Sequence, residues 1–232
     1  MLWKEQHQNH QKMMVGFIAP FVAKIYALIN RIIVANAKLN STSFGRIIMI
    51  KNVKVYGLEE SVKASKYPMS VDIDKCSSDV TDTTKKLAGC PIGTGHDQFL
   101  TGIIVQFDLT LSIKCWVEAQ RYHFLDFVSS QSTMHKIAKM DIINNCNAYV
   151  TREAIDNLLA LVQHYNDDPT AENYLAVLYN IPTGFELTAR MTTNYRQLKT
   201  IYKQRKNHRL PEWRKFCEWI ETLPSHEFIT TN

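Results

Sequence analysis

Anion-binding side chains are concentrated in one stretch, MTTNYRQLKTIYKQRKNHRLPEW, which spans residues 191–213. Asn194 and Arg196 stand near its front, where a helix beginning here would present free N–H groups and the positive end of its dipole. An arginine guanidinium also offers a planar fork of donors that matches a phosphate. The stretch indicates either a basic pocket for a phosphorylated ligand or the solvated basic side of an amphipathic helix. Its cations are Arg196, Lys199, Lys203, Arg205, Lys206 and Arg209, and on a helix Arg196, Lys199, Lys203 and Lys206 share one side.

A second stretch, EAQRYHFLDFVSSQSTMHK at residues 118–136, combines charge with small hydrogen-bonding side chains. Arg121 and His123 come first and Asp126 follows. A polar run comes next, and it consists of Ser129, Ser130, Gln131, Ser132 and Thr133. A basic start followed by small polar residues can line a nucleotide or flavin site, and it is equally compatible with a helix that ends in a polar turn.

Two isolated residues are weaker candidates. His96 follows the tight turn Gly93-Thr94-Gly95, and Ser65 ends a short predicted helix. A lone histidine in a loop is more often a surface residue than a functional one. Neither residue predicts a site without further support.

The composition limits the class of protein. The chain has 232 residues, of which 45% are hydrophobic, and its formal net charge of +5 favours anionic partners without requiring nucleic acid. It contains no G-x-G-x-x-G, P-loop or G-x-S-x-G motif, which argues against a Rossmann enzyme and an α/β-hydrolase. Its five cysteines form no C-x-x-C pair. We therefore expect no zinc site, and free thiols in a reducing cytoplasm.

The first 48 residues form an apolar and basic extension that has three open interpretations. Residues 13–37 contain the small-residue step Ala35-Asn36-Ala37 of a secretory leader, and their apolar character also suits a membrane helix. Lys24 and Arg31 interrupt this segment, and a charge near the bilayer centre costs roughly 2.5–3.5 kcal/mol, so we expect no membrane role. In the third interpretation translation begins at Met49 and the extension is not part of the native protein.

The remainder, residues 49–232, is predicted to form a single α+β domain with a mainly helical second half. Alternating and β-branched residues predict strands at residues 47–56 and 103–111. Residues 70–95 are polar and turn-rich, with one helix end at Lys-Lys-Leu-Ala-Gly. Helices are predicted at residues 59–64, 113–127, 151–165, 173–180, 191–206 and 211–222.

Four segments together resemble the flavin-dependent thymidylate synthases in order, spacing and character. They are VKVYGLEESVKAS ending at Ser65; Gly95-His96-Asp97 followed by FLTGIIVQFDL; Arg121-Tyr122-His123 with Ser129 to Ser132; and Pro182 followed by Thr192-Thr193-Asn194-Tyr195-Arg196-Gln197-Leu198, Arg205 and Trp213. The resemblance covers about residues 50–222, and its last segment is the most specific.

This resemblance implies an antiparallel sheet with helices and a homotetramer with FAD at the subunit interfaces. It also implies reductive methylation of dUMP, or a related pyrimidine nucleotide, to dTMP with methylenetetrahydrofolate and NADPH. Under this resemblance we expect no cysteine nucleophile, metal, nucleic acid or membrane to be involved. The implied catalytic residues are Arg121 and His123. The implied flavin-binding residues are Ser65, His96, Arg121, Asn194 and Arg196, and the implied nucleotide-binding residues are Ser129, Ser130, Gln131, Ser132 and Arg205, of which Arg205 meets the phosphate.

The sequence departs from the family pattern at charged positions. The signature Arg-His-Arg reads Arg121-Tyr122-His123, so a fixed positive charge becomes titratable. Leu178 stands where the family carries a phosphate-binding arginine, and an acidic residue expected before the signature serine is absent. Each lost charged contact costs roughly 1.5–3 kcal/mol. Three functions stay open: the methylase itself in a divergent, phage-like or prophage-like form; a catalytically altered relative that binds flavin or nucleotide; and a basic nucleic-acid-binding protein.

Overall fold

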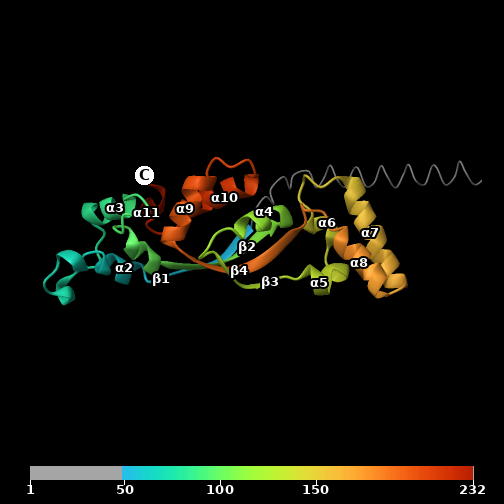
Figure 1. The fold of residues 1–232 in the computed structure, drawn as a ribbon, viewed down its shortest axis with the longest axis horizontal. Helices are drawn as coiled ribbons and strands as arrows, with labels where there is room; N and C mark the ends of the chain where they lie inside the picture. Colours follow the sequence, from blue (N-terminus) through green and yellow to red (C-terminus); the bar gives the residue numbers. More distant parts are fainter. Residues whose placement is uncertain (1–48, 232) are drawn as a thin grey trace, which may run out of the picture. The chain divides into compact units, whose positions relative to one another are not determined.

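The computed structural model describes residues 49–231, and a four-stranded sheet is at its centre (Figure 1). The strands lie in the order β1 (Met49–Tyr56), β2 (Ile104–Ser112), β4 (Glu186–Asn194) and β3 (Asp126–Ser130). All three neighbouring pairs are antiparallel, and β2 pairs with β4 without a break from Ile104↔Asn194 to Ser112↔Glu186. The predicted α+β class with an antiparallel sheet is confirmed.

Apolar residues alternate along β2, so one face of the sheet is the floor of a hydrophobic core. The side chains of Val105, Phe107, Leu109 and Leu111 are buried, and those between them are only partly covered. Met191 of β4 is directly opposite Phe107 in the register and is also buried. The long β2–β4 ladder therefore presents a continuous apolar surface to the helices above it.

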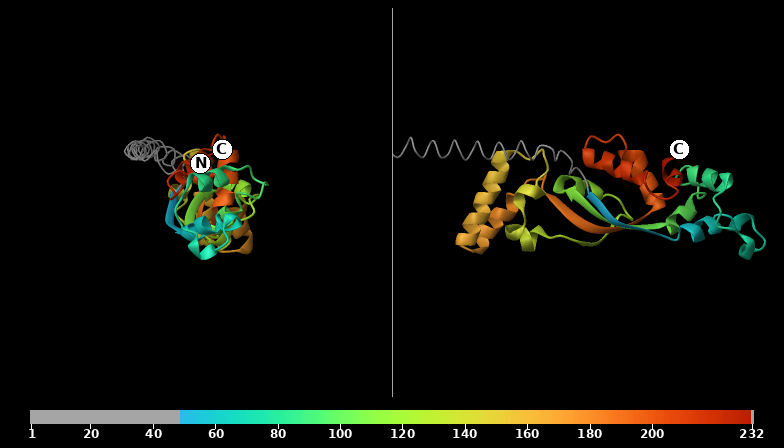
Figure 2. Two further views of the ribbon diagram at one scale, coloured as in Figure 1. Left: turned by 90° about the vertical axis from the view of Figure 1, so that its left-hand side faces the viewer. Right: turned by 180° about the vertical axis from the view of Figure 1, so that it is seen from behind.

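Three helices cover this face: α4 (Ile113–Ala119), α9 (Tyr195–Arg205) and α10 (Pro211–Ile220), as Figures 1 and 2 show. Trp213 and Phe216 of α10 are buried there, and the ring of Phe216 lies 5.9 Å from that of Phe107. The last helix, α11 (Glu227–Thr230), packs against α9. The sheet and these helices form the larger of two hydrophobic clusters.

The second cluster is built by α7 (Arg152–Asp167) and α8 (Ala171–Tyr179). Its fully buried members are Ile137, Leu158, Val177 and Phe185. The side chain of Leu187 in β4 packs against both clusters. Figure 2 shows α7 and α8 at the opposite end of the sheet from α2 (Leu58–Ala64) and α3 (Asp82–Gly89).

The other elements are short and lie in the connections. They are α5 (Thr133–Lys136), α6 (Ile142–Asn145), and 3-10 turns at Tyr67–Met69, Ile73–Lys75, Gln98–Gly102 and Ile137–Lys139. The predicted tight turn near residues 93–95 is present, and both of its glycines adopt positive φ angles.

The structure corrects two helix predictions. The helix predicted at residues 113–127 ends at Ala119, and Asp126–Ser130 is strand β3, which pairs with β4 across more than 50 residues of chain. The helix predicted at residues 191–206 begins only at Tyr195, because Thr192 and Thr193 belong to β4. In both cases a long-range ladder overrides the local helical spacing. The polar run that begins at Ser129 is not a turn after a helix, since Ser129 and Ser130 are strand residues.

The extension at residues 1–48 lies outside the described residues. Its three interpretations concern only that segment. Within residues 49–231, no helix is long and apolar enough to cross a membrane.

Candidate functional site

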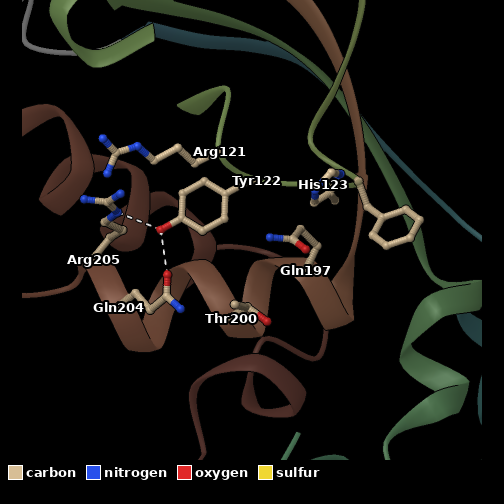
Figure 3. A pocket seen from close by; sticks show the side chains of 8 residues that line it. Arg121, Tyr122, His123, Gln197, Thr200, Gln204 and Arg205 are labelled. Carbon is tan, nitrogen blue, oxygen red and sulfur yellow. Dashed lines mark hydrogen bonds between the residues drawn. The ribbon is translucent and has the colours of Figure 1, made fainter. Parts of the chain in front are cut away.

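A cleft of about 410 Å³ lies between helix α9 and the turn that follows α4 (Figure 3). Arg121, Tyr122, His123 and Phe124 line it from the turn, and Gln197, Thr200, Gln204 and Arg205 line it from the helix. Gln197, Thr200 and Gln204 fall three and four positions apart, so they share one side of α9, and Arg205 directly follows Gln204. Two segments that are about 80 residues apart in the sequence thus meet, and both came from the candidate stretches.

Tyr122 fixes the turn to the helix. Its ring is buried and its hydroxyl donates to Gln204 Oε1 at 2.9 Å while accepting from Arg205 Nε at 2.6 Å. Burial raises the pKa of the phenol, although the hydrogen bond from Arg205 opposes this shift. The phenol is therefore neutral near pH 7, and its role is to hold Gln204 and Arg205 in place.

Arg205 is held on several sides. Its guanidinium carbon lies 4.9 Å from the ring centre of Trp213 and 5.4 Å from that of Tyr122. Its Nη1 is 3.0 Å from Glu118 Oε2 and 2.7 Å from His208 Nε2. Only Nη2 has no hydrogen-bond partner within residues 49–231. Arg205, which was predicted to bind the nucleotide phosphate, therefore has one terminal nitrogen available to a substrate.

Arg121 and His123 are both exposed beside this held arginine. The Arg121 guanidinium has no hydrogen-bond or ion-pair partner in the described part of the chain, and Figure 3 shows it at the end of the cleft near Arg205. The cleft therefore carries two guanidinium groups and an imidazole at its rim. This set suits the binding of an anion and the polarisation of a carbonyl group.

Two buried cysteine thiols interact electrostatically with Arg205 of the cleft. Cys115 on α4 is buried, and burial raises the pKa of its thiol. The same cause raises the pKa of the Cys217 thiol to about 12. A reactive cysteine needs a lowered pKa. Residues 49–231 also contain no cluster of side chains that could hold a metal ion.

A second charged group lies at the first turn of α9. Asn194 caps the helix, because its Oδ1 accepts from the N–H of Gln197 at 2.9 Å. Arg196 follows in the first turn, and its Nε lies 3.2 Å from Oδ1 of buried Asp97. His96 is exposed next to Asp97 in the sequence. Three predicted flavin ligands thus come together at one end of α9.

The other predicted residues do not join either group. Ser65 ends α2, where its hydroxyl donates to Val62 O at 2.7 Å. Ser129 and Ser130 are exposed on the edge strand β3, and Ser132 follows it. Gln131 extends the pairing to β4, since its side-chain oxygen accepts from Thr188 N at 2.8 Å. The Leu178 side chain packs in the second hydrophobic cluster, away from α9.

The position of Lys199 in the basic stretch also differs from one of the two predicted alternatives. The solvated-face alternative puts Lys199 on a solvated basic side with Arg196 and Lys203, but its side chain is 1% exposed. It contacts Asp97 and two backbone carbonyls instead of solvent. The cations of this stretch divide between solvent, the core and the cleft, so the solvated-face alternative fails at Lys199 and the pocket alternative stays a prediction.

Sequence reasoning missed several residues of the site. Gln197, Thr200 and Gln204 have no charge and drew no attention, although their spacing places them on one helix face. Asp97 was visible only as the acid after His96. Glu118 contacts Arg205 from 87 residues earlier, which no local pattern indicates, whereas His208 contacts it from three residues further on.

The fold that carries this cleft is similar to those of known proteins, although the sequence is not. No protein-family model matches the sequence, and no curated protein is significantly similar to it. Among solved structures, the flavin-dependent thymidylate synthase of Helicobacter pylori complexed with FAD and dUMP is similar, with a TM-score of 0.61 and 14% identity over 78% of this chain and 96% of that chain. A second structure of that enzyme with the same ligands gives a TM-score of 0.60 and 14% identity over 80% and 96%.

The UMP/dUMP methylase PolB of Streptomyces cacaoi, bound with 5-Br dUMP, is also similar, with a TM-score of 0.59 and 15% identity over 79% of this chain and 94% of that chain. The likeness extends over nearly the whole length of each of these proteins. The described part of the chain has the fold of the flavin-dependent thymidylate synthases.

Proposed function

We propose that this protein is a flavin-dependent enzyme that methylates dUMP, or a related pyrimidine nucleotide, to dTMP with methylenetetrahydrofolate and NADPH. The observation that carries the proposal is that Arg196 and Arg205 lie at the two ends of one helix, with Arg121 and His123 facing it across the cleft. The similar solved proteins bind FAD with dUMP, or a brominated dUMP. The proposal places the reaction in the cytoplasm, where the five free cysteines stay reduced.

The residues at the start of α9 fit the phosphates of FAD. Arg196 is 27% exposed and uses only Nε for Asp97, so its two terminal nitrogens are available to a ligand. The exposed imidazole of His96 and the amide nitrogen of Asn194 add further donors beside the positive end of the helix dipole. In the proposal these residues bind the cofactor with Ser65, and Arg121 contacts the flavin.

The nucleotide is assigned to the opposite end of α9. Arg205 offers Nη2 to its phosphate, and Arg121 and His123 lie near the flavin and the pyrimidine. When bound, FAD supplies hydride to the uracil ring, and the protein supplies orientation and electrostatics. We assign further nucleotide contacts to Ser129, Ser130, Gln131 and Ser132 of a neighbouring subunit in a homotetramer, because in one chain these residues lie at and directly after the end of the edge strand, outside the cleft.

A growth assay tests the function. The full chain and residues 49–232 are each expressed in a bacterium that requires thymidine, with an empty vector and Arg121→Ala as controls. We expect growth without thymidine from both active forms and none from either control. Growth from residues 49–232 would also support the assignment of a single functional domain there. A purified full chain that neither binds FAD nor supports growth would contradict the proposal.

A second candidate function is binding without turnover. It is favoured by the contacts of Arg205, which Glu118 and Tyr122 occupy, and by the apolar packing of Leu178. This relative would retain FAD and dUMP and fail the growth assay. The nucleic-acid hypothesis is weakened because Lys199 is buried, and steep salt dependence of binding to DNA would be needed to revive it.

A further inference from the structure

A buried ion cluster joins helix α9 to the loop that precedes β2. The carboxylate of Asp97 is 0% exposed and the ammonium-bearing side chain of Lys199 is 1% exposed, with Nζ 3.2 Å from Oδ2. The other carboxylate oxygen, Oδ1, lies 3.2 Å from Arg196 Nε. One acid is thus shared between two cations that are three residues apart on α9.

Lys199 has a complete set of partners. Its Nζ donates to Ala88 O at 2.6 Å, to Cys90 O at 2.5 Å and to Asp97 at 3.2 Å, which matches the three N–H bonds of an ammonium group. Its neighbours on the buried side of the helix, Leu198 and Ile201, are apolar. A buried ion pair is seldom better for stability than well-packed apolar residues. Stability alone therefore does not account for a lysine at this position.

The balance of charge gives this lysine a second role. Asp97 carries one negative charge, and Lys199 and Arg196 each carry one positive charge, so the cluster has an excess of one positive charge. Lys199 is fully enclosed, whereas Arg196 is 27% exposed and its terminal nitrogens have no partner within residues 49–231. The excess charge is therefore presented to solvent at Arg196, beside the positive end of the α9 dipole.

We propose that Lys199 is a positioning residue that neutralises Asp97, so that Arg196 keeps an uncompensated charge for a diphosphate group. Without Lys199, the carboxylate would pair with Arg196 alone and cancel its charge. The identity of the ligand as the diphosphate of FAD rests on the proposed function. The charge relation among the three residues does not.

The test uses the full chain, freed of flavin, with FAD affinity measured by quenching of flavin fluorescence. Lys199→Met should weaken FAD binding by at least about tenfold. The double variant Asp97→Asn with Lys199→Met removes both buried charges, and it should recover affinity to within about threefold of the unmodified protein. Lys203→Met, four residues along the same helix at an exposed position, should leave affinity unchanged.

Recovery in the double variant distinguishes charge balance from simple damage to the fold. A purely structural role for Lys199 predicts a double variant that binds as weakly as Lys199→Met, and that result would overturn the proposal. If Lys199→Met does not fold, as judged by circular dichroism, Lys199→Gln takes its place, since its amide still donates to a carbonyl and carries no charge. Equal FAD affinity of the folded single variant and the unmodified protein would also overturn it.

Inorganic pyrophosphate tests the role of Lys199 independently of the proposed flavin function. It should raise the melting temperature of the unmodified chain, and less so that of Lys199→Met, with the rise restored in the double variant. This pattern without FAD binding would refute the flavin function and support the role of Lys199. If neither pyrophosphate nor FAD binds the unmodified chain, the proposal for Lys199 is wrong.

Discussion

The two ends of helix α9 hold their arginines differently. At the first turn, Arg196 meets a carboxylate whose charge Lys199 already balances, and 27% of its side chain is exposed. At the last turn, Arg205 is 14% exposed, pairs with Glu118, and is enclosed by two aromatic rings. The first arginine keeps two terminal nitrogens for a ligand, and the second keeps one, because Glu118 and His208 contact the other. The same residue type thus takes two roles that depend on what surrounds it.

The strongest way to disturb the enclosed end is Trp213→Ala. The indole is 1% exposed and packs against Phe216, Tyr122 and the guanidinium of Arg205. Loss of so large a buried side chain should lower the free energy of unfolding by about 3–5 kcal/mol. Urea denaturation measures this change, and Tyr179→Ala, at an aromatic residue that is 85% exposed, is the control. Equal losses from both substitutions would show that Arg205 is not anchored by this packing.

Removal of the available arginine should affect binding more than stability. Arg196→Ala deletes a partly exposed group, and we expect it to weaken FAD binding by about tenfold or more, from a lost charged contact of roughly 1.5–3 kcal/mol. The flavin content of the purified protein measures the effect. Arg209→Ala, at an exposed position beyond the helix, serves as the control. Unchanged flavin content in Arg196→Ala would mean that the two ends of α9 do not differ in this way.

Tyr122→Phe examines the hydrogen bonds of the enclosed end while keeping its ring. The change removes the hydroxyl that accepts from Arg205 Nε and donates to Gln204. We expect a loss of about 1 kcal/mol in the free energy of unfolding. Affinity for FAD at the other end of α9 should remain the same. A parallel loss of flavin would indicate that the two ends are coupled.

The pH dependence of stability should show the smallest effect. Burial, and then the charge of Arg205, lower the pKa of His208 from its usual value of 6.5. The unfolded chain therefore binds a proton near pH 6.5 that the folded chain resists, so this histidine's contribution is present above that pH and is lost as the pH falls through its folded-state pKa.

Replacement of this histidine isolates its share of the pH profile. His208→Gln should lose less stability than the unmodified protein between about pH 7.5 and about pH 5, as followed by thermal melts. The comparison requires a buffer series at constant ionic strength, because Glu118 and Arg205 lie beside the ring. Identical profiles for the two proteins would show that the imidazole titrates normally in the folded state.

Local patterns in the sequence predicted what local chemistry determines. Asn194 was expected at the start of a helix and is its N-cap, because its side chain satisfies the free N–H of Gln197. The strand at residues 104–112 also followed from alternation of apolar residues. β3 could not be found in this way, since every one of its residues is exposed and its pairing partner lies about 60 residues away.

The burial of Lys199 was equally beyond local reasoning. Helical spacing placed it correctly relative to Arg196, but its partners come from the end of α3 and the segment after it, about 100 residues earlier: Ala88, Cys90 and Asp97. The difference in surroundings between Arg196 and Arg205 depends on such distant contacts, with Asp97 and Glu118. The sequence therefore predicted the helix that carries the cations, but not which of these cations are buried and which are exposed.

The shared position of Leu187 has a consequence for motion. Because this side chain touches both hydrophobic clusters, it connects the α7–α8 pair to the sheet, and Phe185 O accepts a hydrogen bond from Ile113 N. Regions with separate cores open as separate units in hydrogen exchange. Amides of α7 and α8 should therefore exchange as one group, earlier than those of β2 and β4. The two ends of α9 should keep their geometry while α7 and α8 unfold locally.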